Sequence, residues 1–337
     1  MIGHNLAIEL QNAGHQVTIL DNLSVNNLFT LEGGLRDIAT ERLDLMAANN
    51  IPMIVLDARD YDLMSRTLSA LNTEVIVHLA AISHLSRANK DPYTTFDHSL
   101  RTLENSLDVA VNIGVERLVY FSSSTAYGDF PTETVTEETP LNPRGIYGAL
   151  KASGELMVKA YKDACGLDSV IVRPSALYGA RCVSRRVIQI FIERLLHGET
   201  PLILRGDESL DFTHINDLIQ GVRLCIERDE ALNETFNLTY GEARKVSEVI
   251  DLLRNDFGDF DVSVEAFDAE RPHRGTLSID KAKNLLGYDP KWPIERGVPE
   301  YVNWYKERAN ASKDQKTATH DGALLHLAKL YTRPQGA

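Results

Sequence analysis

Short runs of β-branched and aromatic residues alternate with helix-length segments through the first half of the chain. The runs, which predict strands, cover residues 17–20, 53–56, 75–79, 117–121 and 169–173. The segments with apolar residues three and four positions apart, which predict helices, cover residues 2–13, 60–71, 93–113 and 147–165. Strands that alternate with helices form parallel sheets, because each helix carries the chain back to the same edge. The alternation therefore predicts an α/β fold with a doubly wound parallel sheet.

The pattern changes beyond about residue 174, where the elements become shorter and Pro and Gly mark the joins. We expect three parts: a sheet domain over 1–174, a smaller mixed α/β region over 175–308 with some strands returning to the sheet, and a tail. The tail, 309–337, combines a polar linker with a short apolar stripe that predicts a helix. No internal repeat divides the chain further.

Composition excludes several classes of protein. The 35 basic and 48 acidic residues give a formal charge of −13, which disfavours nucleic-acid binding. No apolar stretch is long enough for a membrane span, and no secretory signal precedes the first helix, so we expect a cytoplasmic protein. Cys165, Cys182 and Cys225 are widely spaced, which predicts neither a disulfide framework nor a metal site.

An acidic residue ends the first predicted strand and points to a dinucleotide. In Rossmann-type folds, an acid about 20 residues after a Gly-rich turn binds the adenosine ribose, and Asp21 fits that role. A carboxylate there favours NAD over NADP. Of the Gly-rich turn itself only Gly3 is present, and no strand precedes it. We therefore expect that the chain begins about ten residues late relative to a complete fold of this type.

A second cluster points to chemistry on a hydroxyl group. The strand at 117–121 is followed by the serine-rich stretch Ser122 to Thr125, and farther along the chain stand Tyr147 and Lys151. The spacing Tyr-x-x-x-Lys places both side chains on one helix face. A nearby ammonium is expected to lower the pKa of the phenol, so that the tyrosine acts as a base, and a serine adds a second hydrogen bond.

Together these motifs resemble the extended short-chain dehydrogenases/reductases, in particular their nucleotide-sugar epimerase and dehydratase group. The similarity covers nearly the whole chain. Besides the Ser, Tyr and Lys residues, it is carried by LDNLS (20–24), HLAA (78–81), RPSALYGAR (173–181), FTHINDL (212–218) and KAKNLLGYDPKW (281–292). The resemblance implies an NAD-dependent homodimer that oxidises a nucleotide sugar to a 4-keto intermediate and returns hydride to the opposite face.

The resemblance also implies roles for individual residues. Catalysis is expected from Ser123, Tyr147 and Lys151. Cofactor binding is expected from Gly3, Asp21, Asn22, Asp57, Ala58, Ala80, Ala81, Ser83, Tyr147 and Lys151. Substrate binding is expected from Ser124, Thr125, Arg205 and Arg271, the two arginines toward the diphosphate. Three more arginines are expected near the substrate cleft that the resemblance implies: Arg181, Arg185 and Arg186. The alternative is that they are ordinary surface charges.

Three interpretations of the function stay open. Dehydratases and decarboxylases of the group need an acid directly after the catalytic Ser/Thr, where this chain has Ser124, Thr125 and Ala126. That difference favours a UDP-hexose 4-epimerase over a dehydratase or reductase. The third alternative is a non-catalytic, truncated paralogue, because the Gly-rich phosphate cradle is incomplete.

Overall fold

The computed structural model describes residues 1–24, 31, 33–82, 85–206, 208–266 and 272–314. Strands and helices alternate in its first half, which confirms the predicted α/β class. The strands there are β1 (Ile19–Asp21), β2 (Met53–Val55), β3 (Val75–His78), β4 (Arg117–Phe121), β5 (Thr134–Val135) and β6 (Ser169–Arg173). The helices there are α1 (Ile2–Asn12), α2 (Gly33–Ala48), α3 (Tyr61–Ala70), α4 (Leu85–Lys90), α5 (Pro92–Phe96), α6 (Thr102–Ile113) and α7 (Gly145–Cys165).

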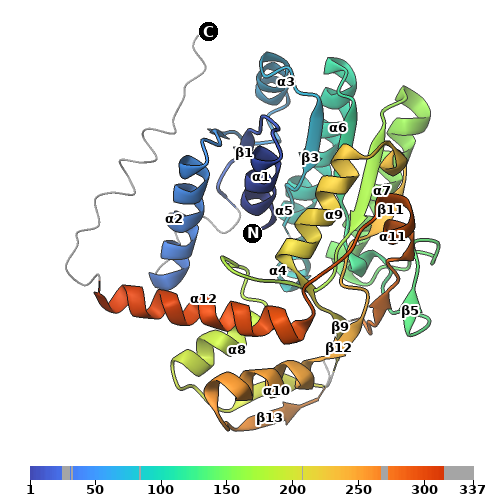
Figure 1. Ribbon diagram of the computed structural model, residues 1–337. Coiled ribbons are helices and arrows are strands. Elements are labelled where there is room, and N and C mark those ends of the chain that lie inside the picture. The colour runs from blue at the N-terminus through green and yellow to red at the C-terminus, as the bar shows by residue number, and fades with distance from the viewer. Residues whose placement is uncertain (25–30, 32, 83–84, 207, 267–271, 315–337) are drawn as a thin grey trace.

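The main sheet is parallel and has the strand order β11-β6-β4-β3, where β11 (Thr235–Asn237) comes from the C-terminal half. Every residue of β4 and β6 is buried, as expected for continuous apolar runs with helices on both faces. Helices α1 and α9 (Ile215–Glu227) pack on one face, where Val119 and Phe121 point. Helices α6 and α7 pack on the other, against Leu118 and Tyr120 (Figure 1).

The first two strands stand apart from this sheet. Strands β1 and β2 pair with each other in parallel, and in the part of the chain that the structure describes neither is hydrogen-bonded to β3. Helix α1 packs on both groups of strands, since Leu6 and Leu10 join the core of the main sheet and Ala7 joins the core beside β1 and β2. This helix therefore links the pair β1 and β2 to the main sheet.

Two regions differ from the elements predicted by periodicity. The segment 93–113 is not one helix: α5 ends at Phe96, and a π-helical turn over Asp97–Arg101 precedes α6. Helix α2 was not predicted, because its buried residues Ile38, Leu43 and Met46 form too sparse a stripe among charged neighbours.

The C-terminal half adds a second core below the sheet. Its further strands are β7 (Leu177–Tyr178), β8 (Leu202–Arg205), β9 (Ser209–Asp211), β10 (Thr213–His214), β12 (Ala243–Lys245), β13 (Val262–Glu265) and β14 (Thr276–Leu277). Its further helices are α8 (Val187–Leu196), α10 (Val246–Phe257), α11 (Asp280–Leu286) and α12 (Ile294–Asp314). Side chains of α8, α10 and α12 enclose this core with β8, and Figure 1 shows the three helices together at the lower end of the molecule.

The tail begins inside a helix. Helix α12 continues past residue 309 to Asp314, so the polar segment expected to be a linker starts within it, and residues 315–337 lie outside the described part of the chain. None of the described helices is long and apolar enough to cross a membrane. The three cysteines are unpaired. The cytoplasmic location stays a prediction.

Candidate active site

The Ser, Tyr and Lys side chains predicted from the sequence lie together where β4 ends and α7 begins. The Lys151 Nζ donates a hydrogen bond of 2.6 Å to the carbonyl oxygen of Phe121, the last residue of β4. It lies 5.9 Å from the centroid of the Tyr147 ring. The Ser123 hydroxyl is within hydrogen-bonding reach of the Tyr147 phenol. The three residues therefore form one polar cluster at the carboxyl end of a central strand.

Two glycines allow α7 to approach the serine-rich loop this closely. A Cβ on Gly148, in the first turn of α7, would lie 2.7 Å from the carbonyl oxygen of Thr125. Gly128 has φ of +74°, and a Cβ there would lie 1.8 Å from the carbonyl oxygen of Asn142. Because side chains at either position would push the loop and the helix apart, these glycines set the distance between Ser123 and Tyr147.

The serine loop is held by its own hydrogen bonds. The Ser123 Oγ accepts from the backbone N–H of Thr125 at 3.2 Å and from the Thr125 hydroxyl at 3.0 Å. The Ser124 hydroxyl donates to Ser175 at 3.2 Å. All of these residues are buried. Ser124 and Thr125, expected to contact substrate, therefore also fix the position of Ser123.

Behind the cluster lies a buried ion pair between α7 and β6. The Arg173 guanidinium contacts the Glu155 carboxylate through two bonds, of 2.6 and 2.9 Å, and both side chains are at most 3% exposed. The Ser122 hydroxyl donates to the same carboxylate. Arg173 also donates to the Tyr127 hydroxyl at 2.7 Å, which in turn donates to Asn237 of β11 at 2.8 Å. This network connects the helix that carries Tyr147 to β6, to β11 and to the residue directly after β4.

The pKa of Tyr147 differs from the sequence prediction. Burial raises the pKa of this phenol above its ordinary value, and the nearby charges of Arg186 and Arg274 and the Ser123 hydroxyl oppose the rise. The charges that oppose the rise are those of these two arginines, while the Lys151 ammonium donates to the Phe121 carbonyl oxygen. The expected direction of the shift was therefore wrong, because desolvation outweighs the neighbouring charges.

Burial affects the lysine as well. Desolvation lowers the pKa of Lys151 to about 8, and the Glu155 carboxylate opposes that shift. The folded protein thus releases this proton at lower pH than the unfolded chain, which holds it up to about pH 10.5. Between these values the unfolded state binds more protons, so the contribution of Lys151 to stability rises with pH.

We therefore expect the wild-type chain to gain stability relative to Lys151→Met as the pH increases from 8 to 10.5. The gain is on the order of 3 kcal/mol, since each pKa unit corresponds to about 1.4 kcal/mol. Denaturant unfolding of both chains at pH 7.5, 9 and 10.5 measures it. Lys159→Met, which replaces an exposed lysine on the same helix, is the control. A difference between wild type and Lys151→Met that does not change with pH would contradict the assignment.

The residues predicted to hold the adenosine end lie together at the ends of β1 and β2. The Asn22 side chain donates to the Asp57 carboxylate at 3.0 Å. One oxygen of Asp21 accepts from the backbone N–H of Leu23 at 2.7 Å, and the other has no partner among the residues described. Asp57 is also bound by Arg59, whose guanidinium holds the pKa of this carboxyl far below its ordinary value. The exposed Asp21 carboxylate is therefore available to accept from a ribose hydroxyl.

The remaining predicted cofactor residues border the same edge of the sheet. The Ala58 carbonyl oxygen accepts from the Asn105 amide at 2.9 Å, and the Ala80 carbonyl oxygen accepts from Thr102 at 3.4 Å. Ala81 follows directly on the loop after β3. Ser83 lies outside the described residues. Gly3 lies in the first turn of α1.

The arginines predicted to bind the diphosphate cannot be placed. Arg271 lies outside the described residues, and for Arg205 only the backbone is described, paired with Glu265 at the ends of β8 and β13. Two other arginines are instead close enough to Tyr147 to influence its pKa: Arg186, directly before α8, and Arg274, shortly before β14. The stretch 271–275, singled out in the sequence, thus contributes Arg274 to the surroundings of Tyr147, and the role of Arg271 stays a prediction.

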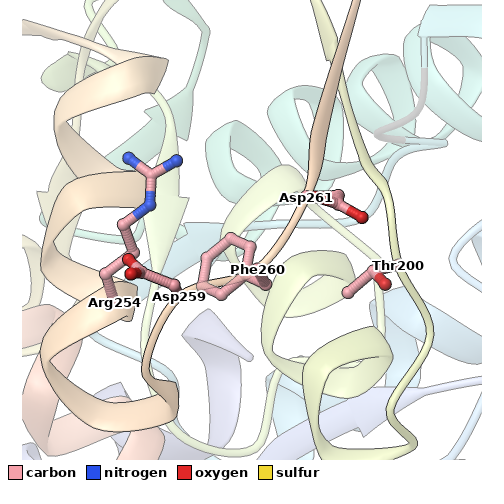
Figure 2. A pocket seen from close by; sticks show the side chains of 5 residues that line it. All are labelled: Thr200, Arg254, Asp259, Phe260 and Asp261. Atoms are coloured by element: carbon pink, nitrogen blue, oxygen red, sulfur yellow. The ribbon is translucent and has the colours of Figure 1, made fainter.

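A surface pocket lies elsewhere, on the C-terminal lobe. Figure 2 shows the side chains that line it, which come from α10, the loop before β13 and the segment before β8: Thr200, Arg254, Asp259, Phe260 and Asp261. The Arg254 guanidinium lies over the Phe260 ring at 5.5 Å and pairs with Asp251 at 2.7 Å. None of these residues belongs to the Ser-Tyr-Lys cluster. Among the residues described, no group of side chains could hold a metal ion.

A doubly wound parallel sheet with Ser, Tyr and Lys at the end of a central strand defines an enzyme of the extended short-chain dehydrogenase/reductase class. The model of the NAD dependent epimerase/dehydratase family matches residues 1–239. The chain belongs to this family, whose cofactor is NAD.

Individual relatives and solved structures are similar to nearly the whole chain. A putative UDP-glucose 4-epimerase from Methanocaldococcus jannaschii is 27% identical over 317 residues, which are 90% of this chain and 95% of that protein. The crystal structure of a Thermus thermophilus UDP-glucose 4-epimerase with NAD has a TM-score of 0.78 at 26% identity and covers 91% and 96% of the two chains. A dTDP-glucose 4,6-dehydratase from Streptomyces venezuelae, solved with NAD, has a TM-score of 0.80 at 27% identity and covers 92% and 95%. The family assignment therefore includes both epimerases and dehydratases.

Proposed function

We propose that this protein is an NAD-dependent nucleotide-sugar 4-epimerase that acts on a UDP-hexose. The observation that carries the proposal is the cluster of Ser123, Tyr147 and Lys151 beside a loop without a carboxylate. Relatives named as UDP-glucose 4-epimerase and UDP-glucuronate 4-epimerase support the same reaction class. The cluster binds a hydroxyl group, and the reaction inverts the carbon that carries it.

In the proposed mechanism Tyr147 removes the proton of the sugar hydroxyl and later returns it. Ser123 donates a hydrogen bond to the same sugar oxygen, and the Lys151 ammonium holds positive charge near the phenol. Arg186 and Arg274 already oppose the rise of the Tyr147 pKa, so they favour its ionised form. NAD, when bound, would supply a ring that can accept a hydride from the carbinol carbon and return it. Tyr147 acts in both directions because the same proton leaves and returns.

The described residues fit a dinucleotide at the adenosine end. Asp21 offers an exposed carboxylate oxygen to ribose hydroxyls, Asn22 is fixed by its bond to Asp57, and Ala58 stands beside them. A carboxylate at this position disfavours a 2′-phosphate, which supports NAD rather than NADP. In this proposal Lys151 holds the nicotinamide ribose and also lies near the Tyr147 ring.

Epimerisation is favoured over dehydration by the charges around the cluster. Dehydration also requires a group that moves a proton at C5 and protonates the departing hydroxyl at C6. Ser124, Thr125 and Ala126 carry no carboxylate, and the nearby Glu155 is bound to Arg173 and Ser122. No acid of the loop 122–128 is therefore available for the second proton transfer.

The test is a direct assay of the full chain with NAD. We expect UDP-glucose and UDP-galactose to interconvert to a common equilibrium mixture, which chromatography or proton NMR of the sugar nucleotides would detect. UDP-glucuronate and dTDP-glucose are assayed in parallel. Formation of a 4-keto-6-deoxy sugar from dTDP-glucose would show a dehydratase instead. Binding of NAD without turnover of any of the four sugars would overturn the proposed reaction.

We also propose that the protein forms a homodimer through α6 and α7. Three large apolar side chains are exposed on this side of the molecule: Leu156 of α7 is 68% exposed, and Tyr93 and Phe96 of the neighbouring α5 are 85% and 48% exposed. Exposed apolar groups of this kind mark interfaces, and two-fold dimers use one surface twice.

Leu156→Asp is therefore expected to convert a dimer into a monomer. A charge placed in the apolar interface would have to be buried without a partner in both copies. Light scattering coupled to size-exclusion chromatography measures the mass of each variant. Val264→Asp, at a residue of β13 that is 72% exposed, is the control and is expected to stay dimeric. A wild-type chain that is monomeric, or a Leu156→Asp chain that is still dimeric, would rule out this interface.

A further inference from the structure

The carboxylate of Asp129 joins three segments that lie far apart in the sequence. It accepts two hydrogen bonds from the Arg144 Nη1, one at each oxygen, of 3.1 and 3.0 Å. Its Oδ1 also accepts at 2.8 Å from the backbone N–H of His273, a residue 144 positions farther along the chain. Asp129 follows the serine loop, Arg144 directly precedes α7, and His273 lies shortly before β14. One side chain therefore forms a junction between the loop after β4, the start of α7 and a segment of the C-terminal half.

The C-terminal segment around Arg274 runs along the chain that follows Asp129. The backbone N–H of Phe130 donates to the carbonyl oxygen of His273 at 2.9 Å, which makes the contact between the two segments reciprocal. Farther on, β14 pairs in parallel with β5. Between these contacts lies Gly275, where a Cβ would lie 2.3 Å from a backbone oxygen of the facing chain. Arg274 is therefore held on both sides, and Asp129 makes one of the two holding contacts.

The junction lies beside the catalytic cluster. Arg144 stands three positions before Tyr147, and Arg274 directly follows His273. Both partners of Asp129 thus border residues of the site. In agreement with this geometry, the charge of Arg274 opposes the rise of the Tyr147 pKa. The hydrogen bonds to Asp129 therefore hold the segment that carries Arg274 against the start of the helix that carries Tyr147.

The Asp129 contacts determine geometry more than stability. The side chains of Asp129 and Arg144 are 44% and 42% exposed, and ion pairs this exposed contribute little to the free energy of folding, because water screens them. The bond from the His273 N–H is the main cause that lowers the pKa of Asp129, so the carboxyl is ionised at neutral pH. An ionised carboxylate only accepts, whereas the amide of an asparagine would turn its own N–H groups toward one of the two donors. Asp129→Asn therefore breaks the junction without a large loss of stability.

We propose that Asp129 is a positioning residue of the active site, whose carboxylate fixes the segment 272–276 against the start of α7 and so holds Arg274 beside Tyr147. The inference rests on the proposed function, because Arg274 matters to the reaction only if Tyr147 is the base. The other ionisable side chains that act on this phenol or contact its ring are Arg186, Lys151 and Tyr120.

The first test is the pH dependence of kcat for the full chain with NAD and UDP-glucose. Asp129→Asn and Arg274→Met are both expected to move the acid side of the profile, where kcat rises with pH, by about half a unit to one unit toward higher pH, because a more distant positive charge favours the phenolate less. At a fixed pH on that side, kcat then falls about three- to tenfold. Loss of the Asp129 charge acting directly would lower the Tyr147 pKa and move the profile the other way. The direction of the shift therefore separates a displaced Arg274 from a direct charge effect.

A double variant shows whether Asp129 acts through Arg274. Asp129→Asn combined with Arg274→Met is expected to shift the profile no more than Arg274→Met alone, because the segment then carries no arginine to position. Asp168→Asn is the matched control, since it removes an acid of similar exposure that binds Lys162 at the other end of α7. It is expected to leave the profile unchanged. Thermal unfolding of each variant shows whether it is folded.

Hydrogen exchange tests the junction without turnover. Asp129→Ala removes the acceptor of the His273 N–H group, so a peptide covering residues 273–278 is expected to exchange about three- to tenfold faster than in the wild type, while a peptide from β4 exchanges equally in both. Unchanged exchange in Asp129→Ala, a profile of Asp129→Asn that stays in place or moves to lower pH, or additive shifts in the double variant would each overturn the proposal. A wild-type chain that epimerises no sugar would overturn the proposed function, and the exchange of this peptide would still decide whether Asp129 holds the segment.

Discussion

Tyr147→Phe is expected to lower kcat by about 10²- to 10⁴-fold, the range that a positioned acid–base group contributes. The variant keeps the ring that packs near Lys151 and removes only the oxygen that exchanges the proton. NAD affinity and the thermal unfolding temperature are expected to stay close to those of the wild type, since the phenol oxygen contributes one hydrogen bond with Ser123. Steady-state kinetics with UDP-glucose measure the effect.

The matched control for this variant is Tyr161→Phe, which removes a hydroxyl from the same helix near its C-terminal end, about four turns away from Tyr147. It is expected to leave kcat within about twofold of the wild type. If Tyr147→Phe retained more than a tenth of the wild-type kcat, another group would have to move the proton. Equal losses in both variants would indicate damage to α7 rather than to the chemistry.

Glu155→Gln is expected to destabilise the fold by about 3–5 kcal/mol. The substitution is nearly isosteric but leaves the Arg173 guanidinium charged, 3% exposed and without its counterion. It also changes the acceptor of the Ser122 hydroxyl, and Ser122 directly precedes Ser123 in the serine loop. Denaturant unfolding at pH 7 measures the difference in free energy.

The control for the buried pair is the exposed pair Arg101 and Glu104, whose side chains are both 47% exposed. Glu104→Gln is expected to cost less than about 1 kcal/mol, because solvent screens such pairs. A double variant, Glu155→Gln with Arg173→Met, is expected to lose less than the two single changes together. If Glu155→Gln cost no more than Glu104→Gln, the buried ion pair would not be a main support of α7.

The sheet was the most predictable part of the molecule. Strands β4 and β6 have the same bounds as the predicted runs, because strands that are buried on both faces are rich in apolar residues and here carry polar ones only at their ends. Helix α7 was predicted from its periodicity within two residues of its start. Helix α2 and the π-helical turn at Asp97–Arg101 were not predicted. The apolar residues of α2 are too few to show a helical period, and the wider turn of a π-helix leaves no clear pattern in the sequence.

The candidate site was predictable only where it depends on local spacing. Tyr147 and Lys151 share one helix face, and the serine loop follows its strand directly, so their proximity could be inferred. Arg186 and Arg274 approach Tyr147 from segments far along the chain, and tertiary contacts alone bring them there. The direction of the Tyr147 pKa shift depends on how much water the fold excludes, which spacing does not reveal.

The two separate cores have a consequence for how substrate choice can change. The chemistry rests on the sheet core around β4 and β6, whereas α8, α10 and α12 enclose a core of their own. Substitutions that repack the second core can reshape the C-terminal half while Tyr147 stays in place, because the helix that carries Tyr147 is held to the sheet by Arg173. In a fold built in this way, one half of the sequence can change while the groups at the end of β4 keep their positions.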